Sequence, residues 1–296
     1  MSTPTAPCPS LRRLAWFGIV LFIVCPKVGW AQSRLDSTTS NAIARTDRVV
    51  VLTFDDSAKT HFTTVRPILL KYGFNATFFI TEGWDFATNK KDYMTWEEIA
   101  QLHRDGFEIG NHTRDHMGVT DKTKDRLEEQ LQAIDDHCKE HGIPKPISFA
   151  WPGNSTTLAA FPILEKHGIR FARRGGAPER SYESGQGFAF EAGKDHPLLL
   201  PSAGDAKPKW ELADFIEAAK QAQGNRIAIL QFHGVPDTAH AWVSTATDKF
   251  DAYMHYLAVE KYRVVALRDL LDILPPSDPP QDPMAIIQAR LRGLVK

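Results

Sequence analysis

The chain has 296 residues, of which 43% are hydrophobic and 24% are charged, and its formal net charge is -1. This composition is that of a folded protein with a sizeable apolar core. It excludes the general attraction to polyanions that a strongly basic chain has. Since no segment combines clustered Lys and Arg with aromatic residues, we expect no nucleic-acid partner.

The N-terminal region has the pattern of a secretory signal peptide. Two arginines precede an apolar run at 14–24, and a polar stretch follows the small residue Ala31. Because a membrane span needs about 20 apolar residues, this shorter run predicts cleavage near Ala31 and export to the periplasm or the exterior. An uncleaved N-terminal anchor is the alternative. We assign residues 1–31 to the signal peptide and 32–46 to a polar linker, and expect no membrane span in the mature chain.

From about residue 47, short β-type runs alternate with amphipathic helical stretches. The expected strands are 49–54, 75–80, 107–112, 147–152, 169–174, 197–202, 227–233 and 262–267. The expected helices are 62–72, 95–105, 123–140, 158–167, 211–222 and 248–260. Apolar strands separated by helices are typical of a parallel sheet covered by helices. We therefore predict an α/β fold, a (β/α) barrel of up to eight strands over residues 47–274, with a doubly wound open sheet as the alternative. Residues 275–296 form a C-terminal tail with a short helix at 283–294.

Polar residues end five of the expected strands. They are Asp55 and Asp56, Asn111 and His112, Pro152 to Asn154, Arg173 and Arg174, and His233. In a (β/α) barrel the carboxyl ends of the strands form the face that carries the active site. The five strand ends therefore predict one shared polar rim.

Two neighbouring carboxylates, Asp55 and Asp56, end the first strand. Two free carboxylates in a dry place repel each other, and one is driven toward its neutral form. The pair is explained if a cation binds one of them. His112 and His116 are four residues apart and can turn both imidazoles toward one ion. With a carboxylate oxygen of Asp56 and an open position for water, they would form a catalytic zinc arrangement.

Four motifs occur in a fixed order along the chain: LTFDD at 52–56, GNHTRDH at 110–116, FAWPG at 149–153 and LQFHGV at 230–235. Together they resemble the motifs of the polysaccharide deacetylases, the NodB homology domain of carbohydrate esterase family 4. The resemblance extends from about Val49 to about Leu270. It implies a distorted (β/α) barrel of seven to eight strands. It also implies removal of acetyl groups from N- or O-acetylated polysaccharides with a divalent metal, for which zinc is the ion we expect.

The resemblance assigns a metal site, a base, an acid and an oxyanion donor to matching positions. Asp56, His112 and His116 would bind the metal, Asp55 would be the general base, His233 the general acid, and the N–H of Gly153 the oxyanion donor. Thr113 would steady the metal loop. The reaction requires these types, because an amide needs an activated water, a base, a stabilised oxyanion and a protonated leaving amine.

Two features of the family have no direct counterpart in this sequence. The family's third motif carries an arginine near the base, and here Ala150 stands near that place. Arg173 or Arg174, at the next strand end, would replace it. The Asp–Trp element that orients the acidic histidine has no clear copy, and Asp205 is the best substitute.

Three residues near strand ends are candidates for contact with an acetylated polysaccharide or oligosaccharide. They are Trp151, Asn154 and Trp242. Sugar rings stack on aromatic faces, which favours the two tryptophans. For Trp84 we expect packing in the core or under a loop instead.

Three other functions fit part of the pattern. Relatives on the same fold hydrolyse other linear C–N bonds, and some of them dispense with the metal, whereas the ligand set is intact here. The same ligands could hold iron for an oxygenase, but that chemistry needs neither Asp55 nor His233. A glycan-binding barrel without activity would be expected to have lost one of these two residues.

Overall fold

The structure is a computed structural model, and it describes residues 48–293. The signal peptide and the linker expected at 1–46 lie outside the described residues. Within residues 48–293, no helix is long and apolar enough to span a membrane.

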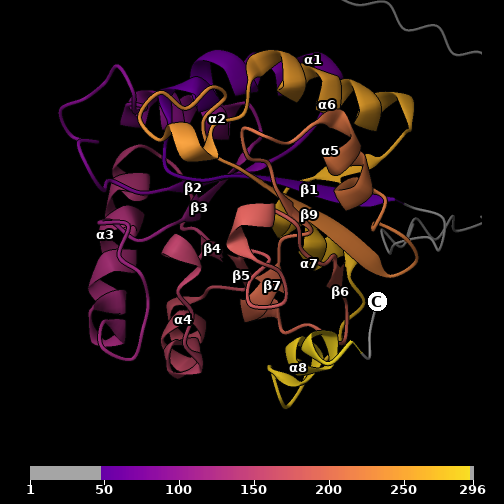
Figure 1. The fold of residues 1–296 in the computed structure, drawn as a ribbon. Coiled ribbons are helices and arrows are strands. Elements are labelled where there is room, and N and C mark those ends of the chain that lie inside the picture. The colour runs from indigo at the N-terminus through magenta and orange to yellow at the C-terminus, as the bar shows by residue number, and fades with distance from the viewer. Residues whose placement is uncertain (1–47, 294–296) are drawn as a thin grey trace, which may run out of the picture. The chain divides into compact units, whose positions relative to one another are not determined.

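Ten strands of the described chain form one sheet (Figure 1). They are β1 (Val49–Phe54), β2 (Thr77–Ile80), β3 (Glu108–Asn111), β4 (Ser148–Ala150), β5 (Phe171–Arg174), β6 (Phe190–Glu191), β7 (Leu200–Pro201), β8 (Gly204–Asp205), β9 (Arg226–Phe232) and β10 (Arg263–Val265). Neighbours follow the order β6-β9-β1-β2-β3-β4-β5-β7, while β10 also pairs with β1 and β8 with β9. All pairs are parallel except β6 with β9. Each expected strand overlaps an observed one, and the additional strands β6 and β8 have two residues each.

One short segment brings the two sides of the sheet together. β7 pairs with β5, and three residues further along the chain β8 pairs with β9. Between them, the N–H of Ser202 donates to the carbonyl of Arg174 at 3.0 Å, and the N–H of Ala203 donates to the carbonyl of Ile229 at 2.7 Å. Residues 200–205 therefore bridge β5 and β9. The result is a nearly closed, distorted barrel, as predicted, and not an open sheet.

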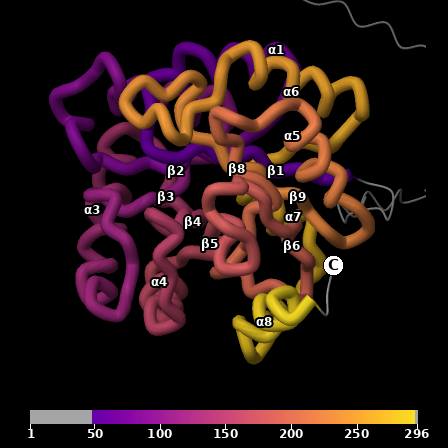
Figure 2. Tube along the Cα trace, in the orientation of Figure 1, coloured from indigo at the N-terminus to yellow at the C-terminus, as the bar shows by residue number. Residues whose placement is uncertain are grey.

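Helices cover the outside of the barrel. They are α1 (Arg66–Tyr72), α2 (Trp96–Arg104), α3 (Leu127–Glu140), α4 (Phe161–His167), α5 (Leu212–Ala219), α6 (Thr247–Val259), α7 (Leu270–Ile273) and α8 (Ala285–Leu291). Figure 2 shows α1, α6 and α5 along one side, and α3 beside α4 along another. The six expected helices are confirmed, with a π-helical turn at His61–Val65 before α1. The helix expected at 283–294 is α8.

Strand alternation decides which side chains enter the barrel. Val50 and Leu52 of β1 belong to the apolar cluster beneath the helices, whereas Val49 and Val51 pack in the barrel interior with residues of β9. Because successive side chains of a strand point to opposite faces, Asp55 continues the inward set. The apolar pattern of β1 thus places a carboxylate at the mouth of the barrel.

Candidate active site

A cavity of about 310 Å³ lies at the carboxyl ends of the strands. It is lined by Asp55, Asp56, Trp84, His112, His116, Trp151, Gly153, Asn154, Tyr182, Gln231, His233, His240, Trp242 and Val243. Of the thirteen residues to which the sequence assigns a role at the site, nine are among these. The exceptions are Thr113, Arg173, Arg174 and Asp205.

Asp56, His112 and His116 form a compact group of possible metal ligands. Oδ1 of Asp56 lies 3.4 Å from Nε2 of each histidine, and the three ligand atoms all lie within 4.8 Å of one another. Nδ1 of His112 is 2.8 Å from the carbonyl of Ala150. A carbonyl only accepts, so Nδ1 carries the proton and Nε2 is free to bind a metal.

An unsatisfied oxygen supports the same interpretation. Oδ1 of Asp56 is buried and has no hydrogen-bond partner among the described residues. Buried polar atoms are nearly always paired, and a bound cation would supply the partner that this oxygen lacks. One carboxylate oxygen and two imidazole nitrogens fit a divalent metal such as zinc.

The electrostatics of the group suit metal binding. Burial, together with the neighbouring His112, lowers the pKa of His116 to about 4. Burial alone would raise the pKa of Asp56, but the neighbouring His112 and the charge of His233 hold that pKa below its usual range. At neutral pH the carboxylate is therefore ionised and His116 is neutral, which are the states that bind a metal.

The backbone of the metal group is held in an unusual conformation. Asp56, Thr113 and His116 have φ values of 74°, 57° and 51°. This left-handed region is unfavourable for residues other than glycine, and such strain gathers at functional sites. Oδ1 of Asn111 accepts from the N–H of Thr113 at 3.0 Å, and Oγ1 of Thr113 accepts from the N–H of Met117 at 2.7 Å. These bonds give Thr113 a position from which it would steady the metal loop.

Asp55 lies beside the metal group and is paired with Arg173. Nη2 of Arg173 donates to both carboxylate oxygens, at 2.6 and 2.5 Å, and Nε2 of Gln231 donates at 3.3 Å. The Arg173 side chain is fully buried, and its Nε and Nη1 have no partner within the described residues. An arginine from β5 therefore reaches the candidate base.

The structure does not bring Arg174 to the site, which corrects the expectation from the sequence. Its guanidinium donates to both oxygens of Glu179, at 2.8 and 2.7 Å, and its Nε donates to the carbonyl of Leu199. The reason is the alternation of side chains along β5, which points Arg173 inward and Arg174 outward.

His233 lies between two carboxylates. Its Nε2 is 3.8 Å from Oδ2 of Asp56, and its Nδ1 is 3.8 Å from Oδ1 of Asp205. Both Nδ1 of His233 and Oδ1 of Asp205 are buried without a hydrogen-bond partner in the described part of the chain. Burial raises the pKa of Asp205. β8, a strand too short to predict, places this carboxylate behind the histidine.

Aromatic residues surround the mouth of the cavity. Trp242 is 64% exposed and Trp84 is 50% exposed, and the ring of His240 lies 4.6 Å from Trp84 and 5.2 Å from Trp242. Trp84 also lies 4.4 Å from the ring of His116. We expected Trp84 to pack in the core or under a loop, but it is half exposed and lines the cavity. Trp84, Tyr182, Gln231 and His240 line the cavity but were missed, since three of them lie on loops without a periodic pattern.

The other two predicted contacts lie deeper. Trp151 is only 1% exposed, and its Nε1 donates to the carbonyl of Leu198 at 3.0 Å. Oδ1 of Asn154 accepts from the N–H of Gly175 at 2.6 Å. Both residues line the cavity, and these two hydrogen bonds hold its wall.

Comparison with solved structures gives the class of fold. Bacillus subtilis PdaA, a family 4 carbohydrate esterase, has a TM-score of 0.52 and 18% identity, over 78% of this chain and 85% of that one. A family 4 acetyl xylan esterase from Clostridium thermocellum, in complex with a cobalt ion, has a TM-score of 0.51 and 18% identity, over 75% and 90%. The protein therefore has the barrel of the family 4 carbohydrate esterases.

The sequence comparisons match part of the chain to a family. Residues 42–172, less than half of the chain, match the family model described as polysaccharide deacetylase. A peptidoglycan-N-acetylglucosamine deacetylase of Bacillus cereus is 27% identical over 131 residues, which are 43% of this chain and 57% of the relative. The chain thus spans little more than half the length of this curated relative. Asp55, Asp56, His112 and His116 lie inside the matched segment, while Arg173 and His233 follow it.

Proposed function

We propose that this protein is a metal-dependent hydrolase that removes acetyl groups from an N- or O-acetylated polysaccharide or oligosaccharide. One observation carries the proposal: the Asp56, His112 and His116 group lies between an arginine-paired Asp55 and His233 in one cavity. The match of residues 42–172 to the polysaccharide deacetylase family model supports the same reaction. The printed name of the Bacillus cereus relative supports a peptidoglycan-type substrate among the candidates.

Asp56, His112 and His116 would hold the divalent metal, and we propose zinc. When bound, the metal supplies a Lewis acid that polarises the acetyl carbonyl and lowers the pKa of water. The hydrogen bond from Nδ1 of His112 to Ala150 fixes the ring so that Nε2 faces the site. Outer contacts of this kind orient the ligands of a metal.

The remaining steps belong to side chains and backbone of this chain. Asp55 takes the proton of the attacking water, and Arg173 holds both of its oxygens in place. Gly153 lines the cavity, where its N–H donates to the oxygen that gains negative charge. His233 gives a proton to the leaving nitrogen or oxygen, and Asp205 orients it from the far side.

Substrate contact and delivery complete the proposal. Trp242, which is largely exposed at the mouth, offers a face for a sugar ring, and Trp151 and Asn154 form the inner wall. A signal peptide at 1–31 and a linker at 32–46 would carry the catalytic domain, residues 47–274, to a polymer outside the cytoplasm.

Acetate release by the purified protein tests this function. Acetylated glycans of several classes are supplied after chelation and again with added zinc. We expect acetate release that stops with chelator and returns with zinc. His116→Ala should lose it, whereas His141→Ala, at the other histidine pair spaced by four residues, should retain it. If one equivalent of metal binds and no glycan yields acetate, the deacetylase assignment is wrong.

A further inference from the structure

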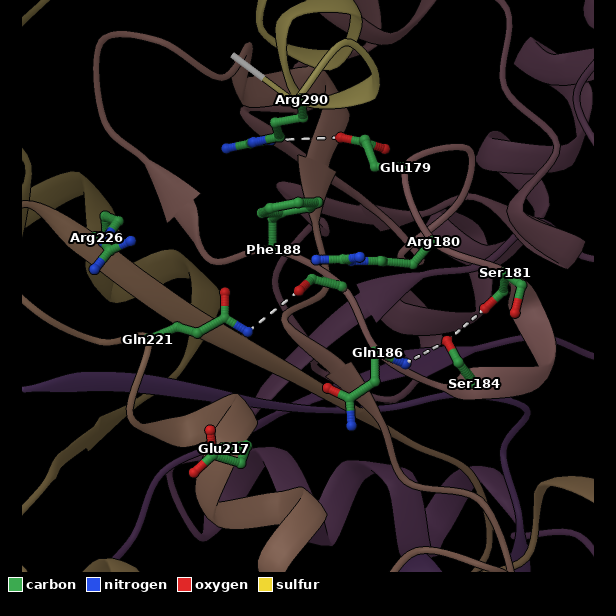
Figure 3. A pocket seen from close by; sticks show the side chains of 12 residues that line it. Glu179, Arg180, Ser181, Ser184, Gln186, Phe188, Glu217, Gln221, Arg226 and Arg290 are labelled. Carbon is green, nitrogen blue, oxygen red and sulfur yellow. Dashed lines mark hydrogen bonds and ion pairs between the residues drawn. The ribbon is translucent and has the colours of Figure 1, made fainter. Parts of the chain in front are cut away.

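A second and larger pocket lies outside the candidate active site (Figure 3). Its volume is about 980 Å³, roughly three times the 310 Å³ of the reaction cavity. Residues 179–188 form one wall, and α5, the start of β9 and α8 supply the others. Residues 175–199, between β5 and β7, contain no α-helix. The pocket therefore lies where the layer of barrel helices is interrupted.

One arginine of this pocket, Arg290, is already paired with buried carboxylates of the chain. Arg290 donates from Nη1 and Nη2 to the two oxygens of Asp195, each at 2.7 Å, and lies 3.5 Å from Glu179. Glu179 is also paired with Arg174. Two guanidinium groups and two carboxylates thus balance one another in a buried network, which leaves no charge for a ligand.

Two other arginines of the pocket have no such partner. Arg180 and Arg226 make no ion pair with any described residue. The guanidinium of Arg180 lies 4.9 Å from the centre of the Phe188 ring, an arrangement that leaves its N–H edges free to donate. Glu217, on the opposite wall, is paired with Lys220 at 3.8 Å. The pocket therefore offers two guanidinium groups that form no ion pair with a described residue.

The pocket and the reaction cavity share a wall that is one loop thick. Tyr182 lines the reaction cavity, while its neighbours Ser181 and Ser184 line the second pocket. Adjacent Cα atoms are about 3.8 Å apart. The loop is held in place, because Nε1 of Trp210 donates to the carbonyl of Ser184 at 3.1 Å and the ammonium of Lys207 lies 3.1 Å from the centre of the Tyr182 ring. Residues 181–184 therefore separate the reaction cavity from the second pocket.

We propose that this pocket binds carboxylate-bearing sugar units of the glycan whose acetyl group occupies the reaction cavity. Arg180 and Arg226 would pair with the carboxylates, since guanidinium groups match carboxylates in geometry and charge. Gln186, whose side chain makes no hydrogen bond with a described residue, would donate to sugar hydroxyls. The identity of the polymer rests on the proposed function, whereas the binding of an acidic glycan does not.

Calorimetric titration of the chelated full-length protein tests the proposal without turnover. The probes are an oligogalacturonate and a neutral chito-oligosaccharide of equal length. We expect Arg180→Gln/Arg226→Gln to weaken the oligogalacturonate about tenfold, equivalent to about 1.4 kcal/mol, and to leave the neutral probe unchanged. Arg104→Gln, an exposed arginine on α2, is the matched control and should bind as the wild type does. Equal binding of oligogalacturonate by the wild type and the double variant overturns the proposal.

Turnover separates this proposal from the proposed function. The double variant should release acetate from a short neutral substrate at the wild-type rate, and its KM for a long carboxylate-bearing substrate should rise with kcat unchanged. If acetate is never released but oligogalacturonate binding depends on the two arginines, the proposed binding pocket is supported and the deacetylase function is wrong. If acetate is released but the arginines do not affect acidic glycan binding, the deacetylase function is supported and the proposed binding pocket is wrong.

Discussion

The two ends of the barrel bury carboxylates in different ways. At the amino end, Oε1 of Glu108 accepts from Oγ of Ser148 at 2.6 Å, and Oε2 accepts from Oγ1 of Thr77 at 2.7 Å and from the N–H of Arg268 at 2.8 Å. Both carboxylate oxygens of Glu108 therefore have hydrogen-bond partners. At the carboxyl end, Asp56 and Asp205 each keep one buried oxygen that no described residue satisfies.

This difference indicates a structural role for Glu108 and a binding role for Asp56 and Asp205. Burial raises the pKa of both Glu108 and Asp205, so a pKa shift alone does not distinguish them. The hydrogen bonds do distinguish these two carboxylates, because an unpaired buried oxygen such as Oδ1 of Asp205 costs free energy that a bound partner can recover. We therefore expect changes at the carboxyl end to affect turnover and changes at the amino end to affect stability.

The largest effect is expected at Asp55. Asp55→Asn removes the base but leaves Asp56, His112 and His116 in place. Since a general base contributes about 10²- to 10⁴-fold to a rate, acetate release should fall about 10³-fold while one equivalent of zinc still binds. Acetate assays and metal analysis of the same preparation measure both quantities. Activity above a tenth of the wild-type value would remove Asp55 from the mechanism.

Neighbouring arginines on β5 provide the next comparison. Among the described residues, Arg173 is the only arginine that contacts Asp55. Arg173→Lys shortens this side chain, and a misplaced base should lower kcat about 100-fold. Arg174→Lys is the matched control, because it changes an equally buried neighbour that faces Glu179. That variant should melt at a lower temperature and keep its kcat. Equal kcat values for the two variants would contradict the inward position of Arg173.

The amino end should respond in the opposite sense. Glu108→Gln replaces an accepting oxygen with an amide nitrogen, and leaves a donor of Thr77, Ser148 or Arg268 unsatisfied. The free energy of unfolding should fall by about 1–3 kcal/mol, and kcat per folded molecule should not change. Denaturant unfolding and acetate assays check the two halves. A loss of kcat with unchanged stability would show that the two ends are not separate in function.

Much of the barrel could be predicted because its long strands are apolar throughout. β6 and β8 have two residues each, too few for any pattern, yet β8 closes the barrel and supplies Asp205. The metal group could be predicted from the residue types at two strand ends. The sequence could not show which of Arg173 and Arg174 points into the barrel. Both faces of β5 pack against apolar residues, so its pattern does not distinguish the inward face from the outward face.

The aromatic mouth was the least predictable part of the site. Trp84 lies on a loop and has a φ of 55°, a conformation that a periodic sequence pattern does not predict. Its position depends on contacts made far along the chain, with His116 and with His240. Such residues come together only when the barrel is formed, so their shared role is a property of the fold.

A buried histidine beside the site gives the smallest effect and a test by pH. Nε2 of His61 donates to the carbonyl of His233 at 3.2 Å, and its ring packs against Phe54 and Phe78. Burial lowers the pKa of His61 from 6.5 to about 4. Between these values the unfolded chain binds a proton that the folded chain does not, so stability falls as the pH falls through this window.

His61→Phe keeps an aromatic ring in place and removes the titrating group. Between pH 7 and pH 5.5, the wild type should lose about 1 kcal/mol more stability than the variant, as expected for a pKa lowered from 6.5 to about 4. Denaturant unfolding of the chelated proteins at both pH values measures the difference. His255→Gln, at an exposed position of α6, should follow the wild type. Parallel losses in the wild type and His61→Phe would show that this histidine is not held neutral by the fold, and would place the acid sensitivity of the barrel elsewhere.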